Sequence, residues 1–146
     1  MEEVLIRYVH FLAILILTAA LVGQHLVIAK EVASSAFKKL AVLNTLYIVA
    51  AILSLAAGLL LWLVVGKPTE FYSANFLFHI KLTLFLVIVL LSIRPSIYFY
   101  RTKKTLTEST VLPRYIIISL RVQLTLLIIL PLLASLVARG VGLSAD

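Results

Sequence analysis

NFLFHIKLTLFLVIVLLSIRPSIYF, residues 75–99, decides the fold of this chain. A helix that crosses the hydrocarbon core of a bilayer needs about 20 mostly apolar residues, and this stretch exceeds that length. Three more stretches of the same kind cover roughly residues 4–28, 40–65 and 112–138. The sequence therefore predicts four transmembrane helices.

Short segments connect the four predicted helices: AKEVASSAFKK, GKPTEFYSA and YRTKKTLTESTVLPR. Short connections make consecutive helices antiparallel neighbours. We therefore expect an all-α fold, a transmembrane up-down-up-down four-helix bundle formed by a single domain over residues 1–146.

The composition supports a membrane protein. The chain is 63% hydrophobic and 13% charged, whereas a soluble domain averages about 45–50% apolar and about 25% charged residues. It has no cysteine, which excludes disulfides, thiolate metal sites and thiol catalysis. The opening residues MEEVLIRY lack the basic start of a cleaved signal peptide, so we expect the first apolar stretch to remain as a helix.

Basic residues predict the orientation in the membrane. Those in or beside the first and third connections are Lys30, Lys38, Lys39, Arg101, Lys103, Lys104 and Arg114. The positive-inside rule places these connections, loops 29–39 and 100–111, in the cytoplasm and both termini outside. We expect a multi-pass protein of the bacterial inner membrane. Its net charge of +7 then reflects orientation, not nucleic-acid binding.

Three ionisable residues share one depth in the predicted bundle. His10 lies on the first helix, and His79 and Lys81 lie on the third. These helices run in the same direction, so all three residues lie roughly 6–9 Å below the outer boundary at the helical rise per residue. Ionisable residues inside a membrane are costly and usually functional. This common depth predicts one polar site in the outer half of the bundle.

The third helix leaves two alternatives for this site. His79 and Lys81 point about 200° apart, so only one can face His10. If His79 does, the metal ligands are His10 and His79, which together could bind a haem iron. If Lys81 does, the site could hold an anionic ligand or a tetrapyrrole. In the ordinary alternative, Lys81 extends to the headgroups, His79 lies at the interface and His10 bonds a backbone carbonyl.

Two further features of the outer half concern Arg7 and a group of small residues. Arg7 lies one turn outward of His10 on the same helix face. It either pairs with a propionate of a bound haem or is an ordinary interfacial arginine.

Ser54, Ala57 and Gly58 on the second helix indicate close helix packing and not part of a site.

A second polar layer is predicted nearer the cytoplasm. Its members are Gln24, His25, Asn44, Arg94, Arg121 and Gln123. They form either an anion site, for lipid headgroups, propionates or a quinone head, or a set of interhelical hydrogen bonds with both arginines extended to the headgroups. His25 lies roughly 22 Å from His10 along the helix. No other histidine shares its level, so a second bis-histidine haem is excluded.

Other chemistries lack the residues that they require. No pair of acids lies within the predicted helices, which argues against a carboxylate proton relay or a di-iron centre. No H-E-x-x-H, Walker or G-x-S-x-G motif is present. The lack of acids and of Gly-rich broken helices also argues against a small-solute or ion permease.

Two segments carry a resemblance to known families. RYVHFLAILIL in the first helix and FYSANFLFHIKLTLFLVIVLLSIRPSIYFYR in the third resemble a small family of four-helix bacterial membrane proteins of unassigned function, up to about residue 104. The helix-one histidine and the helix-three H-x-K-L motif are more distantly similar to HemJ-type protoporphyrinogen oxidases and CopD-type membrane proteins. The HemJ resemblance implies haem or porphyrin binding, carried over only by His10 and Lys81.

These observations combine into one functional hypothesis. We expect an integral membrane protein that binds heme b or a porphyrin in its outer half and has a redox or electron-transfer role. Its cofactor-binding residues are His10, with Lys81 or His79, and Arg7. Besides the lipid bilayer, the partners are a quinone or a redox protein, and a homo-oligomer is an open alternative. The competing hypothesis is a non-catalytic accessory or assembly subunit without a cofactor.

Overall fold

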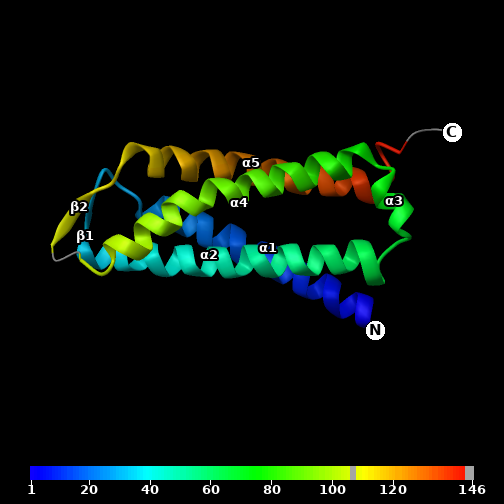
Figure 1. Ribbon diagram of the computed structural model, residues 1–146, viewed down its shortest axis with the longest axis horizontal. Coiled ribbons are helices and arrows are strands. Elements are labelled where there is room, and N and C mark those ends of the chain that lie inside the picture. Colours follow the sequence, from blue (N-terminus) through cyan, green and yellow to red (C-terminus); the bar gives the residue numbers. More distant parts are fainter. Residues whose placement is uncertain (106–107, 144–146) are drawn as a thin grey trace.

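The computed structural model of the chain describes residues 1–105 and 108–143 (Figure 1). Four helices in it are long and apolar enough to cross a membrane. Their bounds are α1 Glu2–Val27, α2 Ser34–Leu60 with its continuation as the π-helix η1 Leu61–Val65, α4 Phe76–Thr102 and α5 Arg114–Ala138. The expected all-α bundle with four candidate transmembrane helices is confirmed.

The helices pack as two antiparallel pairs. α1 packs mainly on α2, and α4 packs mainly on α5, while contacts of α2 with α4 and of α1 with α5 join the pairs (Figure 1). The fully buried core includes Leu17, Leu21, Leu40, Ile88 and Ile116. It draws on all four long helices, so one core holds the two pairs together.

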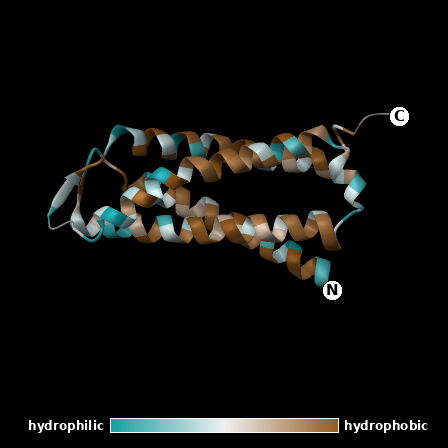
Figure 2. Ribbon diagram, viewed as in Figure 1, coloured by the Kyte–Doolittle hydropathy of each residue, from teal (hydrophilic) through white to brown (hydrophobic). Residues whose placement is uncertain are grey.

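Apolar side chains also cover the outside of the bundle. Leu15, Ile52, Leu90 and Ile128, one on each long helix, are all exposed. Figure 2 shows apolar residues along the middle of the helices and hydrophilic residues gathered toward the two ends. In water such a surface would be unfavourable, whereas lipid tails solvate it, so the structure is that of a lipid-embedded bundle.

The second helix differs most from its predicted bounds. It was expected at 40–65 and begins at Ser34. The exposed Lys38 and Lys39 made the segment resemble a loop, but they are helical, and Phe37 and Leu40 on the opposite face are fully buried. Burial of one face thus extends the helix beyond the apolar stretch.

A small antiparallel ribbon joins the first and third connections. Strand β1, Glu31–Ala33, pairs with strand β2, Ser109–Val111, in the register Glu31↔Val111, Val32↔Thr110 and Ala33↔Ser109. We call this end of the bundle the ribbon end. The N-terminus, the short helix α3 (Thr69–Ser73) and residues after α5 lie at the opposite end, the α3 end (Figure 1). Both connections predicted to be cytoplasmic therefore lie at one end.

Two residues shape the chain at the α3 end. Gly66 follows η1, and a Cβ there would clash with the Leu61 carbonyl oxygen, so only glycine fits. Asn75 caps α4, since its Oδ1 accepts from the backbone N–H groups of Leu77 and Phe78 at 3.0 and 3.3 Å. Its Nδ2 donates to the Val141 carbonyl at 2.9 Å. Asn75 thereby fastens the segment after α5 to the start of α4.

Candidate functional site

His10 packs from α1 against α2. Its Nδ1 lies 2.9 Å from the backbone carbonyl oxygen of Ser54. A carbonyl oxygen can only accept a hydrogen bond, so Nδ1 carries the proton of the neutral imidazole. The other ring nitrogen, Nε2, then keeps its lone pair, which is the form of histidine that binds a metal.

Gly58, one turn beyond Ser54 on α2, makes room for this ring. A Cβ at Gly58 would lie 3.1 Å from Cε1 and 3.5 Å from Nδ1 of His10. We call the surface formed by the Ser54 carbonyl and Gly58 the histidine seat. The small residues expected only to pack helices therefore also orient His10.

Lys81 is the second member of the outer site. It is half-buried on α4, at the same end of the bundle as His10. No carboxylate pairs with Lys81, since the only ion pair among residues 1–105 and 108–143 joins Arg7 and Glu3. The structure therefore places one imidazole and one ammonium, the latter without a carboxylate partner among the described residues, at the same end of the bundle on different helix pairs.

His79 is not part of this pair. It is exposed on α4, and its Nε2 lies 2.8 Å from the backbone carbonyl oxygen of Ser73. The rotation of α4 that half-buries Lys81 turns His79 to the surface, as the angle between them requires. The arrangement with Lys81 is therefore favoured over iron held by two histidines. The part of the chain that the structure describes also holds no group of three or more His, Cys, Asp or Glu residues suited to a metal ion.

Arg7 is exposed and forms an ion pair with Glu3, one turn earlier on α1. Its first partner is therefore a carboxylate of the protein. An exposed pair of this kind contributes little to stability, typically about 0–1 kcal/mol, so the guanidinium remains free to exchange partners.

The inner polar layer is only partly a network. The Asn44 amide donates to the Ser96 hydroxyl at 3.1 Å and links α2 to α4. The Ser119 hydroxyl donates to the Leu91 carbonyl at 2.7 Å and links α5 to α4, and the Gln123 amide donates to Ser119 at 3.1 Å. Asn44 and Gln123 thus serve the interhelical hydrogen bonds expected of this layer.

Several buried polar atoms of this layer have no hydrogen-bond partner among the described residues. They are both amide atoms of Gln24, Nε2 of His25, the hydroxyl of Tyr47 and Oε1 of Gln123. His25 uses its Nδ1 locally, on the Leu21 carbonyl at 2.8 Å. Unpaired buried polar atoms cost free energy, so these particular atoms do not contribute to the stability of the core.

The two arginines of the predicted layer lie on the surface instead. Arg94 and Arg121 are both exposed. The Arg94 guanidinium lies over the Tyr115 ring, 5.1 Å from its centroid. The sequence grouped these arginines with the inner layer by depth alone, and the helix rotation separates them from Asn44 and Gln123.

Comparison with known proteins identifies a family. Residues 2–142 match the family described as "Predicted membrane protein (DUF2214)". The chain belongs to the DUF2214 family. No curated protein matches this DUF2214 chain, and no solved structure matches it. The sequence predicted a family of four-helix membrane proteins. The match to DUF2214 confirms a membrane protein family, and the structure has four candidate spans.

Sequence reasoning missed two kinds of residue in this DUF2214 protein. The histidine seat depends on a backbone carbonyl and on an absent side chain, neither of which appears in the sequence as a polar side chain. Tyr47 is 1% exposed with an unpaired hydroxyl, but a tyrosine in an apolar stretch resembles any other aromatic residue. The small residues at 54 and 58, spaced one turn apart, were the only available indication.

Proposed function

We propose that this DUF2214 protein binds a haem or porphyrin at His10 and Lys81 and has a redox or electron-transfer role. The observation that carries the proposal is the 2.9 Å contact between His10 Nδ1 and the Ser54 carbonyl. Metal-binding histidines usually donate their second ring N–H to a carbonyl or carboxylate, which fixes the tautomer and the ring orientation.

The residues present fit such a group. His10 would hold the iron of a haem through Nε2, and the seat on α2 restricts the rotation of the ring. Lys81 offers a cation for a propionate, a proton donor or a second ligand. Arg7 could exchange Glu3 for a propionate at the rim. The bound group would supply either a redox-active iron or an oxidisable ring, and the chain would supply ligation, charge and exclusion of water.

The resemblance to HemJ-type oxidases and CopD-type proteins adds support from residue types alone. It rests on a histidine of the first helix and a lysine of the third, and His10 and the half-buried Lys81 are the residues of this chain that carry it. The finer proposal is that the site lies in the outer half of a bacterial inner-membrane protein. A quinone or a redox protein would then exchange electrons with it.

Absorption spectroscopy tests the proposal. The detergent-purified protein should show a Soret band or acquire one when hemin is added, and His10→Ala should remove it. His79→Ala is the matched control, because His79 belongs to the same polar level but is exposed. A protein that stays colourless with hemin, or an unchanged spectrum in His10→Ala, would overturn the proposal.

A second candidate function is a non-catalytic accessory or assembly subunit. It is favoured by the local partners of the polar residues, since His79 bonds the Ser73 carbonyl and Arg7 bonds Glu3. The two functions differ in one measurement. An accessory subunit should fold and stay monodisperse without any chromophore, and hemin should not raise its thermal stability.

A further inference from the structure

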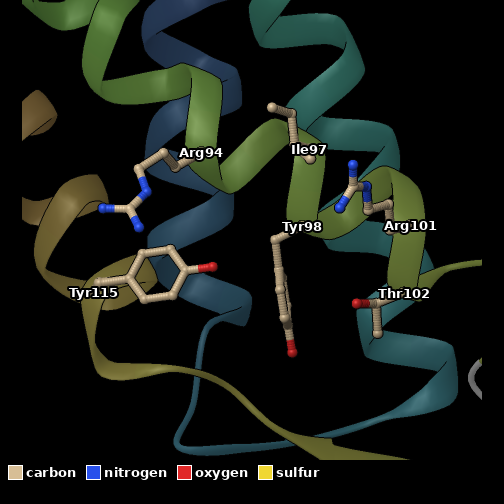
Figure 3. Close-up of a pocket in the computed structure, with 6 residues that line it drawn as sticks. All are labelled: Arg94, Ile97, Tyr98, Arg101, Thr102 and Tyr115. Carbon is tan, nitrogen blue, oxygen red and sulfur yellow. The ribbon is translucent and has the colours of Figure 1, made fainter.

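A pocket lies at the ribbon end, far from His10 (Figure 3). It has a volume of about 340 Å³ and is lined by Arg94, Ile97, Tyr98, Arg101, Thr102 and Tyr115. All but Tyr115 belong to the last turns of α4, on one helix face, while Tyr115 closes the pocket from the first turn of α5 (Figure 3).

Two guanidinium groups border this pocket without an anionic partner. The only ion pair of the described residues, Arg7 with Glu3, lies at the other end of α1. Arg94 contacts the Tyr115 ring face at 5.1 Å, which leaves its N–H groups available at the ring edge. Arginine presents planar, paired donors that match phosphate oxygens. Two such groups two turns apart therefore favour an anion with several oxygens.

The walls of the pocket are held in place. Ser119 of α5 donates to the Leu91 carbonyl of α4 at 2.7 Å, so the two helices keep their separation beside the pocket. Tyr98 packs on Phe37 of α2, with ring centroids 6.2 Å apart. These contacts fix the backbone and the central tyrosine, and they leave the two arginine side chains to adjust.

The surroundings favour a lipid over a free anion. Ile97 lies between the two arginines on α4 and is 47% exposed, and Ile93 on the next turn is 46% exposed. This apolar strip continues from the pocket toward the middle of the span. A phospholipid matches both parts, since its phosphate fits the arginines and its acyl chain fits the isoleucines. Inorganic phosphate matches only the first.

We propose that this pocket binds the phosphate of an anionic phospholipid in the leaflet at the ribbon end. Arg94 and Arg101 hold the phosphate oxygens, and the hydroxyls of Tyr98 and Thr102 supply further donors. Basic residues near the ends of spans attract anionic lipids through the surface charge of the bilayer. The pocket adds a defined place for one headgroup. This proposal is independent of the haem site.

Lipid competition tests it on the full-length protein in detergent. The probe is a fluorescent phosphatidylglycerol, displaced by unlabelled phosphatidylglycerol, by phosphatidylcholine with the same chains, or by inorganic phosphate. The test variant is Arg94→Gln/Arg101→Gln. The control is Lys103→Gln/Lys104→Gln, which removes the same charge at the same end from residues outside the pocket.

We expect the arginine variant to lose at least about tenfold in affinity for phosphatidylglycerol, because each charge-assisted bond is worth about that factor. The lysine variant should lose less, and phosphatidylcholine and inorganic phosphate should displace the probe poorly. Equal losses of phosphatidylglycerol affinity in both variants would indicate general attraction by surface charge and would overturn the proposed binding at the pocket. Efficient displacement by inorganic phosphate would overturn the lipid as ligand. If the double variant fails to fold, the single Arg101→Gln variant carries the same comparison.

Discussion

The imidazole of His10 lies so close to Gly58 that a Cβ at this position would be 3.1 Å from Cε1 of the ring. The ring thereby reaches the Ser54 carbonyl, 2.9 Å from Nδ1. Orientation of the candidate ligand thus depends on a residue of the neighbouring helix that has no side chain.

Substitution of Gly58 should disturb the site through this contact. We expect Gly58→Val to push the ring away from the Ser54 carbonyl and to weaken hemin binding at least about tenfold, which corresponds to about 1.4 kcal/mol. Hemin titration measures the loss. A double-mutant cycle on the free energy of unfolding supplies the control. Gly58→Ala should be better tolerated in a His10→Ala background, where alanine's helix propensity favours it by about 1 kcal/mol. Equal effects in both backgrounds would contradict the contact.

Removal of the Lys81 charge should weaken tetrapyrrole binding. We expect Lys81→Met to lower the hemin affinity about tenfold, because a hydrogen bond to a charged group contributes about 1.5–3 kcal/mol. Lys67→Met is the control, since Lys67 lies in the connection at the same end and contacts the Phe71 ring at 4.0 Å. An unchanged hemin affinity in Lys81→Met would contradict a role of Lys81 in binding the tetrapyrrole.

Buried amides of the inner layer should have opposite effects on stability. Gln24 is fully buried with both amide atoms unpaired, so Gln24→Leu should raise the free energy of unfolding by about 1–3 kcal/mol. Asn44→Leu breaks the bond to Ser96 and should lower it by about 0.6 kcal/mol. Thermal unfolding in detergent measures both. A destabilised Gln24→Leu would indicate that the amide has a bound partner.

The cap of α4 should stabilise the α3 end in two separable ways. Asn75→Ala removes both the cap and the bond to the Val141 carbonyl, and we expect it to cost about 1–2 kcal/mol. Asn75→Asp keeps the acceptor for the N–H groups of α4 and loses only the donor to Val141, so it should cost less. Thr69→Ala, at the start of the exposed helix α3, should have little effect on the melting temperature.

The orientation can be measured directly, because the chain has no cysteine. Lys103→Cys should react with an impermeant maleimide only after the cytoplasmic side is opened, and Lys67→Cys should react in intact cells. The physical reason is the excess of lysine and arginine in the connections at the ribbon end. The reverse pattern would place the His10 site in the inner half of the membrane.

The sequence predicts the number of helices from the length of each apolar stretch, and their alternation from the short connections between them. It fails at the start of α2, where Lys38 and Lys39 are exposed while Phe37 is buried on the same helix. Charged residues occur on the exposed face of a helix as well as in the connection that precedes it. Only the packing of Phe37 distinguishes the two cases.

The sequence predicts the depth of the candidate site in the membrane, but it does not predict which side chains point toward His10. Counting residues places His10, His79 and Lys81 at one level, since the rise of a helix is fixed. Which of His79 and Lys81 faces His10 depends on how α4 is rotated by its contacts with the other helices, and no local pattern encodes that rotation. For the same reason Arg94 and Arg121 were grouped with residues from which the structure separates them.

The ribbon of β1 and β2 fastens two helical hairpins, α1–α2 and α4–α5, at one extremity. His10 belongs to the first hairpin and Lys81 to the second, near the opposite extremity. The segment of η1 and α3 joins the same hairpins covalently at that opposite end, so the hairpins are connected at both ends. A molecule bound by both residues would add a further link and stiffen the interface between the hairpins.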